Sequence, residues 1–215
     1  MRLLLTGFEP FGGERINPSG EIVRAVAADS PAGVEVVPLI LPVRVRVAFE
    51  RLLPALDEPG LDAWLGLGQA GGRTHLSVER VGINLLIDRG EELPDEVAGP
   101  REQALVEAGA AAYFARLPVA EIAARIAAAG APAVVSNSAG AYICNEALYV
   151  VQHHLATTGR DLPSGFIHVP YLPEQAAGKR VGTPSIALAT QVLGVRAAIA
   201  AVGELVAGRA RAVAR

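Results

Sequence analysis

The sequence contains a single cysteine, Cys144, whose surroundings suit a thiol nucleophile. An apolar segment predicts a strand over Ala133–Ser136, small residues follow at 138–140, and a helix is expected to begin close to the cysteine. Helix N-termini favour the thiolate, the nucleophilic form of cysteine, and their unpaired N–H groups can hold an oxyanion. A lone cysteine is commonly just a small buried hydrophobe, so Cys144 by itself is only a candidate.

A histidine at the end of an apolar segment supplies the base that such a thiol requires. His168 lies 24 residues after Cys144, and its neighbours predict a strand over 165–169. Active sites of open α/β sheets gather at the carboxyl ends of strands, and a histidine buried in a strand requires a polar partner. We therefore expect Cys144 and His168 to meet at one edge of a sheet.

Two glycine-rich segments share only part of the pattern of phosphate-binding loops. Residues 66–71, GLGQAG, fit the dinucleotide pattern G-x-G-x-x-G, which requires a helix directly after the glycines. The next residues, 74–81, alternate and predict a strand instead. Residues 7–13 are not followed by the Lys-Ser/Thr pair of a Walker loop. We interpret both segments as tight turns between strands and helices.

The histidines and serines form no other familiar catalytic pattern. No two histidines are four residues apart, there is no H-E-x-x-H motif, and there is no second cysteine. His153 and His154 are adjacent near the expected end of a helix, where a partial positive charge suits the helix dipole. The segment SNSAG at 136–140 lacks the first glycine of G-x-S-x-G. We expect no metal, no other cofactor and no serine nucleophile.

Strands and helices alternate along the chain, which predicts a mostly parallel twisted sheet covered by helices on both faces. Pro54 is expected to end the second helix. Residues 88–100, which are charged and contain two prolines and two glycines, are expected to form a surface loop. The fold prediction is a single three-layer α/β/α domain spanning residues 1–215. The expected strands are 2–6, 34–41, 64–67, 75–86, 133–136 and 165–169, and the expected helices are 17–28, 45–53, 104–117, 119–129, about 144–154, and 184–208.

Composition indicates a globular protein without a strong field of either sign. Of its 215 residues 51% are hydrophobic and 19% are charged, and the net charge is −3. Nothing in this balance favours nucleic acid or an anionic membrane as a partner. The apolar start of the chain is interrupted by Gly7 and is shorter than a signal-peptide core, and polar side chains interrupt the apolar segment 186–207. We therefore expect a cytoplasmic protein.

Five segments together resemble the family of pyroglutamyl peptidase I, also called pyrrolidone-carboxylate peptidase. They occur in the family's order and at near-family spacing, from residue 1 to about 190. The sequence departs from the family pattern at 88–100, where the acidic loop is longer. The segments are GFEPFGG at 7–13 with NPS at 17–19, GQAGGR at 68–73, ERV and IN between 79 and 84, SN through CN between 136 and 145, and HVP at 168–170.

The resemblance implies a cysteine peptidase that removes N-terminal pyroglutamyl residues from peptides through a thioacyl-enzyme intermediate. It implies that Cys144 is the nucleophile, that His168 is the general base and that Glu79 orients the histidine. Without the resemblance, Glu79 would be interpreted as a solvated strand residue. The resemblance also places six side chains around the substrate: Phe8, Phe11, Gln69, Arg89, Tyr142 and Ile143.

The residue types suit such a substrate. Phe8 and Phe11 would form an apolar slot for a flat, uncharged lactam ring, and the amide of Gln69 can donate and accept hydrogen bonds. Arg89 lies ten residues after Glu79, where the family has an arginine near the oxyanion site. The resemblance further implies that the partners are peptides with N-terminal pyroglutamate and other copies of the same chain, in a dimer or tetramer.

The fold alone leaves two other classes open. A nucleoside phosphorylase-like or nucleotide-binding enzyme would share the doubly covered sheet and would be indifferent to alkylation of the thiol. A non-catalytic binding module would have a pocket without turnover. Hydrolysis of a pyroglutamyl amide, measured before and after alkylation of Cys144, separates these three classes.

Overall fold

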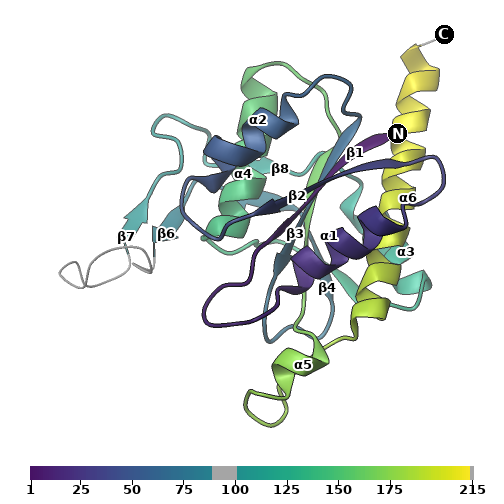
Figure 1. Cartoon of the computed structure of the whole chain (residues 1–215). Coiled ribbons are helices and arrows are strands. Elements are labelled where there is room, and N and C mark those ends of the chain that lie inside the picture. Colours follow the sequence, from purple (N-terminus) through teal and green to yellow (C-terminus); the bar gives the residue numbers. More distant parts are fainter. Residues whose placement is uncertain (89–100, 214–215) are drawn as a thin grey trace.

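A six-stranded twisted sheet forms the centre of the computed structural model, which describes residues 1–88 and 101–213 (Figure 1). Neighbouring strands are parallel except β10 and β4, which are antiparallel. The predicted α/β class with a mostly parallel sheet is therefore confirmed. In spatial order the strands are β2 (Glu35–Leu41), β1 (Arg2–Phe8), β3 (Ala63–Gln69), β10 (Ser164–Val169), β4 (Leu76–Glu79) and β9 (Ala133–Ser136).

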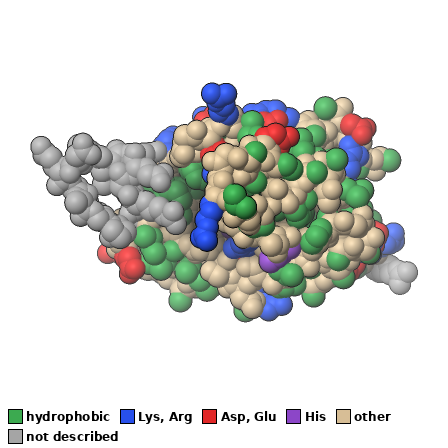
Figure 2. All heavy atoms as spheres, turned by 90° about the horizontal axis from the view of Figure 1, so that it is seen from below, with side chains coloured by type: hydrophobic (Ala, Val, Ile, Leu, Met, Phe, Trp, Pro, Cys, Tyr) green, Lys and Arg blue, Asp and Glu red, His purple; other side chains and the backbone are tan. Residues whose placement is uncertain are grey.

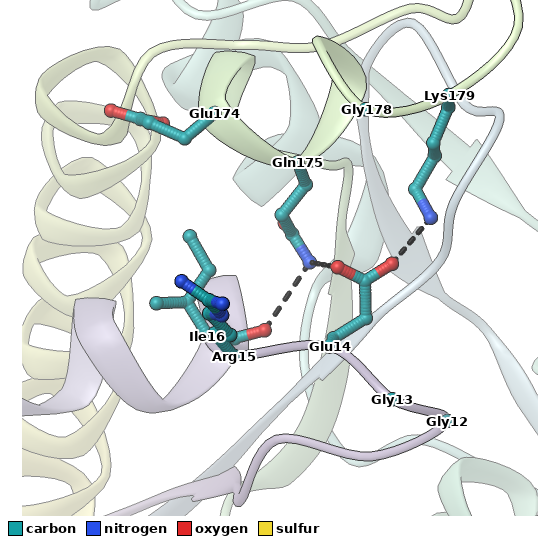
Figure 3. A pocket seen from close by; sticks show the side chains of 9 residues that line it. All are labelled: Gly12, Gly13, Glu14, Arg15, Ile16, Glu174, Gln175, Gly178 and Lys179. Atoms are coloured by element: carbon teal, nitrogen blue, oxygen red, sulfur yellow. Dashed lines mark hydrogen bonds and ion pairs between the residues drawn. The ribbon is translucent and has the colours of Figure 1, made fainter.

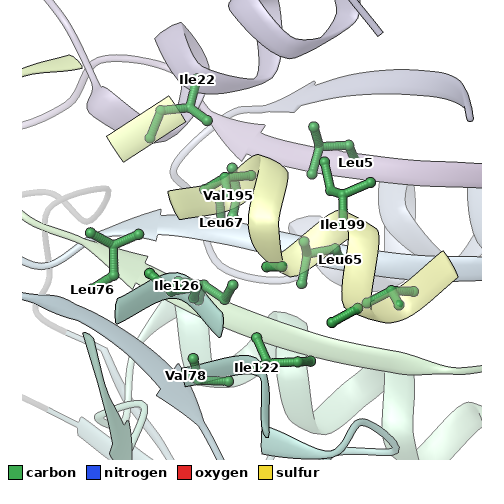
Figure 4. Close-up of a cluster of buried hydrophobic side chains, with 14 of the residues drawn as sticks. Leu5, Ile22, Leu65, Leu67, Leu76, Val78, Ile122, Ile126, Val195 and Ile199 are labelled. Carbon is green, nitrogen blue, oxygen red and sulfur yellow. The ribbon is translucent and has the colours of Figure 1, made fainter. Parts of the chain in front are cut away.

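Three helices cover one face of the sheet: α1 (Pro18–Ala28), α3 (Val119–Ala128) and α6 (Leu188–Val213). Alternate strand residues point to this face and bury aliphatic side chains beneath the helices. Figure 4 shows this cluster, in which strand residues meet side chains from all three helices. Its largest members include Leu5, Leu65, Leu67, Val78, Ile22, Ile126, Val195 and Ile199.

The opposite face is covered by α4 (Ile143–Thr157), the π-helical turn η1 (Ala48–Leu52) and the short helix α2 (Leu53–Leu56). Trp64 and Phe166 are buried here, with their rings 6.3 Å apart. Because successive strand residues face opposite sides, Phe166 and His168 face α4, whereas Ile167 and Val169 belong to the aliphatic cluster under α6. The two faces therefore have different roles: one is aliphatic core, and the other carries the polar groups of the site.

The long helix α6 is the core helix expected near the C-terminus, although it begins at Leu188 rather than at residue 184. By length and composition alone, its segment Leu188–Ala212 could cross a membrane. In the structure, however, its face with Val195, Ile199 and Val202 is fully buried against the sheet, α1 and α3. Part of the apolar surface of α6 is thus buried within the fold.

The expected helix over 104–117 is wrong. Within this segment, β8 (Ala112–Phe114) forms an antiparallel ribbon with β5 (Val81–Ile83). The ring of Tyr113 packs against Tyr149 of α4, and the side chain of Asn84 holds the backbone of Val106 through two hydrogen bonds. These long-range contacts outweigh the helix propensity of an alanine-rich segment.

Two shorter features complete the chain. A second ribbon pairs β6 (Leu86–Asp88) with β7 (Arg101–Gln103), and a single helical turn, α5 (Pro173–Ala176), follows β10.

Pro54 does not end a helix as expected, because it lies in the first turn of α2, where its missing N–H would be unpaired in any case. The end of the molecule that carries α5 shows positive and negative side chains scattered among hydrophobic and uncharged atoms (Figure 2).

Candidate active site

Cys144 lies in the first turn of α4, as the sequence predicts. The helix begins at Ile143, and Tyr142 is its N-cap residue without a side-chain capping bond. Cys144 is partly exposed, and its thiol interacts with the imidazole of His168. Among the residues that the structure describes, the N–H groups of Ile143 and Cys144 have no hydrogen-bond acceptor, as expected for the first turn of a helix.

His168 is held from its other side by Glu79. The two strands that carry them, β10 and β4, are neighbours, and Phe166 is paired with Glu79 while His168 is paired with Ser77. This register places the carboxylate and the imidazole on the same face of the sheet. His168 Nδ1 donates to Glu79 Oε1 over 2.7 Å, and both side chains are buried. Nδ1 therefore carries a proton, and Nε2 is the nitrogen that serves the thiol.

The electrostatics favour a charged histidine. Burial alone would lower the pKa of His168, but the charge and hydrogen bond of Cys144, together with those of Glu79, outweigh it and raise this pKa from 6.5 to about 9. Burial would likewise raise the pKa of Glu79, yet the hydrogen bond and charge of His168, with hydrogen bonds from Ser136 and Arg73, hold it below its usual value. The three groups are thus arranged in a row, with the imidazolium of His168 between the carboxylate of Glu79 and the sulfur of Cys144.

Arg73 is a second partner of the carboxylate, and no role was predicted for it although it lies in the GQAGGR segment. Its Nη1 donates to Glu79 Oε1 over 2.8 Å, so one carboxylate oxygen serves both cations. The neighbouring hydroxyl of Ser136 donates to the carbonyl of Ser138. Glu79 Oε2 has no donor in hydrogen-bond geometry among the described residues, but the Ser136 hydroxyl is near enough to help lower the pKa of this carboxyl.

Two glycines of β3 leave the space that the site occupies. Gly66 and Gly68 lie inside the strand rather than in the expected tight turn, and the next element is the strand β4, as the alternation over 74–81 predicts. A Cβ atom on Gly66 would lie 2.4 Å from the ring of Phe166. A Cβ atom on Gly68 would lie 2.6 Å from Cys144 Sγ. The pattern G-x-G therefore lets an aromatic ring and the thiol lie directly against the sheet.

Two buried polar side chains tie the first turn of α4 to its surroundings, and neither was singled out from the sequence. Asn145 accepts a hydrogen bond from the N–H of Ile83 and donates to the carbonyls of Ile83 and Leu85. Glu146 accepts hydrogen bonds from the N–H groups of Arg46 and Ala48. The turn that carries Cys144 is thus fixed to two separate loops.

A small cavity, about 240 Å³ with its mouth, opens at the thiol. It brings together four of the residues that the resemblance places around the substrate, Phe8, Phe11, Gln69 and Ile143, beside Cys144. The structure adds Val43 and Asn17, which had not been predicted as part of this wall; all seven lining side chains are uncharged.

The two phenylalanines are held differently. Phe8 is the last residue of β1 rather than a loop residue, and its side chain is only 3% exposed. Phe11 follows in the loop and is half-buried. Asn17 anchors this loop, because its Nδ2 donates to the carbonyl of Glu9 while its Oδ1 accepts from Ser19 at the start of α1.

The remaining two predicted substrate-binding residues are Tyr142 and Arg89. Tyr142 precedes Cys144 in the sequence as the N-cap-side neighbour of Ile143 and is not among the described lining residues. Arg89 lies outside the described residues, as does the rest of the segment 89–100. Within the described part of the chain, no cluster of three or more His, Cys, Asp or Glu side chains is placed to hold a metal ion.

Comparison with known proteins gives a consistent family. The family model described as pyroglutamyl peptidase matches residues 1–204. The pyrrolidone-carboxylate peptidase of Levilactobacillus brevis is 45% identical over 203 residues, which cover 94% of this chain and 97% of that protein. Its counterpart in Yersinia pestis is 42% identical over 199 residues, or 92% of this chain and 91% of the relative.

Solved structures agree in fold as well as in sequence. A mutant pyrrolidone carboxyl peptidase from Pyrococcus furiosus superposes with a TM-score of 0.84 at 36% identity, covering 96% of this chain and all of the other. Pyroglutamyl peptidase I from Bacillus amyloliquefaciens superposes with a TM-score of 0.83 at 34% identity, covering 94% of both chains. With a thiol, an imidazole and a carboxylate in a row beside an uncharged cavity, and with these relatives spanning nearly its whole length, the chain belongs to the pyroglutamyl peptidase family.

Proposed function

We propose that this protein hydrolyses the amide bond that follows an N-terminal pyroglutamyl residue of a peptide. Cys144 is the nucleophile, His168 the general acid and base, and Glu79 the group that orients the imidazole. The observation that carries this proposal is the row Cys144–His168–Glu79, which ends at a cavity whose described lining side chains carry no acidic or basic group. Such a cavity suits a terminal residue whose amine is tied up in a lactam.

In the first step His168 Nε2 holds the proton that the Cys144 thiol has given up, and Sγ, as the thiolate, attacks the carbonyl carbon of the pyroglutamyl residue. Glu79 keeps the imidazole oriented through Nδ1 and stabilises its positive charge. The C–N bond then breaks, and His168 returns the proton to the leaving amine. The shortened peptide departs with a free N-terminus, and a thioester remains on Cys144.

In the second step water hydrolyses the thioester. His168, now neutral, takes a proton from the water as its oxygen attacks the thioester carbon. The C–S bond breaks, the sulfur recovers a proton from the imidazole, and pyroglutamate leaves as a free acid. Thiol and imidazole are thereby returned to their starting state.

The start of α4 supplies donors for the developing oxyanion in both steps. The N–H groups of Ile143 and Cys144 have no acceptor among the described residues, and they lie at the positive end of a 15-residue helix. An oxyanion beside Cys144 would accept hydrogen bonds from these groups. Asn145 and Glu146 fix this turn, so the donors are in place before the substrate arrives.

Because Cys144 is the only cysteine, alkylation tests the proposal at a single site. A pyroglutamyl-coupled fluorogenic amide should be hydrolysed, and prior treatment with iodoacetamide should abolish hydrolysis. An excess of 2-pyrrolidinone, a lactam without a scissile bond, should slow the alkylation by filling the cavity. The variant Cys144→Ala should be inactive while its circular dichroism and thermal unfolding remain those of the wild type. Hydrolysis that survives complete alkylation would contradict the proposal.

We also propose that the protein is a homo-oligomer, a dimer or tetramer, in the cytoplasm. The family resemblance supports association, and contact with another copy would cover exposed apolar side chains such as Phe114, at 72% exposure, or Leu193, at 47%. Light scattering during size-exclusion chromatography measures the mass of the particle, and a monomer at micromolar concentration would contradict the first part. Fractionation of the producing cells, with detection of the chain, tests the second part.

A further inference from the structure

Gln175, in the short helix α5, lies behind the wall of the site. It is 5% exposed, and every polar atom of its amide is engaged. Its Oε1 accepts a hydrogen bond from the N–H of Leu172 over 3.0 Å. Its Nε2 donates to the carbonyl of Ile16 over 3.2 Å and to Oε1 of Gln69 over 2.8 Å, with Glu14 Oε2 3.4 Å away.

These neighbours allow one orientation of the Gln175 amide. A backbone N–H is always a donor and a backbone carbonyl is always an acceptor, so Leu172 requires the oxygen on its side and Ile16 requires the nitrogen on the other. Figure 3 shows the nitrogen between the Ile16 carbonyl and the Glu14 carboxylate. Rotating the amide by half a turn would place donor against donor at Leu172 and acceptor against acceptor at Ile16.

The fixed amide of Gln175 in turn orients Gln69. Gln69 presents Oε1 to the Gln175 nitrogen, because its own nitrogen there would face a second donor. Gln69 Nε2 is therefore directed away from Gln175, and it has no hydrogen-bond acceptor among the described residues. Gln69 lines the uncharged cavity beside Cys144, so an unpaired N–H donor is available at this wall.

The segment that carries Gln175 is itself anchored. Lys179 pairs with Glu14, and its ammonium group lies 4.5 Å from the centre of the Tyr171 ring. Lys179 and Glu14 line a larger pocket, shown in Figure 3, and Gln175 lines the same pocket. Gln175 thus connects this pocket to the wall of the smaller cavity through its bond to Gln69.

We propose that Gln175 is a positioning residue for specificity: it fixes the Gln69 amide so that the cavity offers an N–H donor to a ring carbonyl of the substrate. The inference rests on the proposed function, because the carbonyl in question is that of the lactam. A ring without an acceptor at this position, such as that of proline, leaves the Gln69 donor unpaired. Gln175 acts only through Gln69 and does not touch the reacting atoms.

Binding of 2-pyrrolidinone measured by calorimetry tests this without turnover. Gln175→Met keeps the size of the side chain but frees the Gln69 amide to rotate, and it should weaken binding about tenfold, the effect of roughly one hydrogen bond. Gln69→Ala should weaken binding by a similar factor. The double variant should bind no more weakly than the weaker single variant, because Gln175 has no effect once Gln69 is absent.

A matched control separates this effect from general damage to the fold. Gln152 is also a buried glutamine. Among the described residues it donates to Ser164, which lies at the end of β10 opposite to His168. Gln152→Met should lower the unfolding temperature but leave the affinity for 2-pyrrolidinone unchanged. Multiplying effects in the double variant, unchanged affinity in Gln175→Met, or an equal loss in Gln152→Met would each overturn the inference.

Kinetics with the pyroglutamyl amide distinguish this inference from the proposed function. Gln175→Met should raise KM about tenfold with kcat nearly unchanged, because the chemical groups remain in place. If the wild type hydrolyses the amide and Gln175→Met has the same KM as the wild type, the inference about Gln175 is wrong but the proposed function stands. If the wild type binds 2-pyrrolidinone but never hydrolyses the amide, the proposed function is wrong, and the binding measurements alone decide the inference about Gln175.

Discussion

Cys144 packs against the bare backbone of Gly68: a Cβ atom placed there would lie 2.6 Å from Sγ, well inside the normal contact distance. Gly68 is also paired with His168 across the sheet. The strand position next to the histidine is therefore empty, and the thiol occupies the space that a side chain would fill. The position of the Cys144 thiol beside His168 depends on this missing side chain.

Gly68→Ala should displace the thiol from the imidazole. Its methyl group would also lie 2.8 Å from the Phe166 ring, so the strand cannot easily yield. We expect kcat for a pyroglutamyl amide to fall by at least about tenfold, with a loss of unfolding free energy of about 1–3 kcal/mol. Steady-state kinetics and thermal unfolding of the purified variant measure both.

Gly66→Ala is the matched control, because its Cβ would meet Phe166 and Trp64 but not Cys144. It should lose a comparable amount of stability while kcat of the folded fraction changes much less. If the two variants lose activity in proportion to their stability alone, the space over Gly68 has no specific role at the thiol.

The raised pKa of His168 predicts the alkaline side of the pH profile. The proton must stay on the imidazole to be delivered to the leaving amine, and a pKa of about 9 keeps it there across neutral pH. We expect kcat/KM to decline only as the pH rises through about 9, rather than through the ordinary value of 6.5. A profile measured from pH 5 to 10.5 with a pyroglutamyl amide checks this, and a decline centred near 6.5 would contradict it.

Two variants of the charges around His168 should move that decline in opposite directions. Glu79→Gln removes the charge that stabilises the imidazolium, so the decline should shift to lower pH and kcat should fall on the order of 10²- to 10⁴-fold. Arg73→Met removes a cation that shares Glu79 Oε1, so the decline should stay in place or shift to higher pH. A shift in the same direction for both would mean that Glu79 is not the dominant partner.

Of the two phenylalanines in the cavity, we expect Phe8 to contribute mainly to stability and Phe11 mainly to substrate binding. Phe8 is almost fully buried, so Phe8→Ala should cost about 3–5 kcal/mol of unfolding free energy. Phe11 is half-buried in a loop, so Phe11→Ala should instead raise KM about tenfold with little loss of stability. Thermal unfolding and kinetics on the two variants separate these effects.

Wild-type protein should also reject a prolyl amide. Its ring nitrogen is protonated at neutral pH, and the lining residues that the structure describes include no acidic side chain to pair with it. We expect kcat/KM about 10⁴-fold below that for the matched pyroglutamyl amide. Comparable cleavage of the two amides would show that the uncharged wall does not set the specificity.

The parts of the fold that the sequence predicted are those with a clear pattern. The alternation of predicted strands and helices was sufficient to predict a sheet covered by helices on both faces. The strand that ends near His168 and the helix that begins near Cys144 were also predicted at the positions where the structure has them. The helix prediction over 104–117 was wrong because contacts with Asn84 and Tyr149, which are distant in sequence, determine the conformation of this segment. Propensity within a segment contains no information about such partners.

The same limit applies to the site. The thiol and the histidine could be recognised by residue type, but Glu79 required the family resemblance, because a strand glutamate is ordinarily solvated. Arg73 and Gln175 were missed for a related reason. Arg73 acts through Glu79, six residues away, and Gln175 acts through Gln69, 106 residues away, and neither spacing indicates that the two side chains meet.

The position of β10 has a consequence for the order in which the protein folds. β3 and β4 follow one another in the chain, yet they do not pair, because β10 inserts between them about a hundred residues later. Until that strand docks, Glu79 has no histidine and the centre of the sheet is open on both sides. A nascent or truncated chain that ends before residue 169 would expose two unpaired strand edges, so the last central strand both closes an aggregation-prone gap and completes the site.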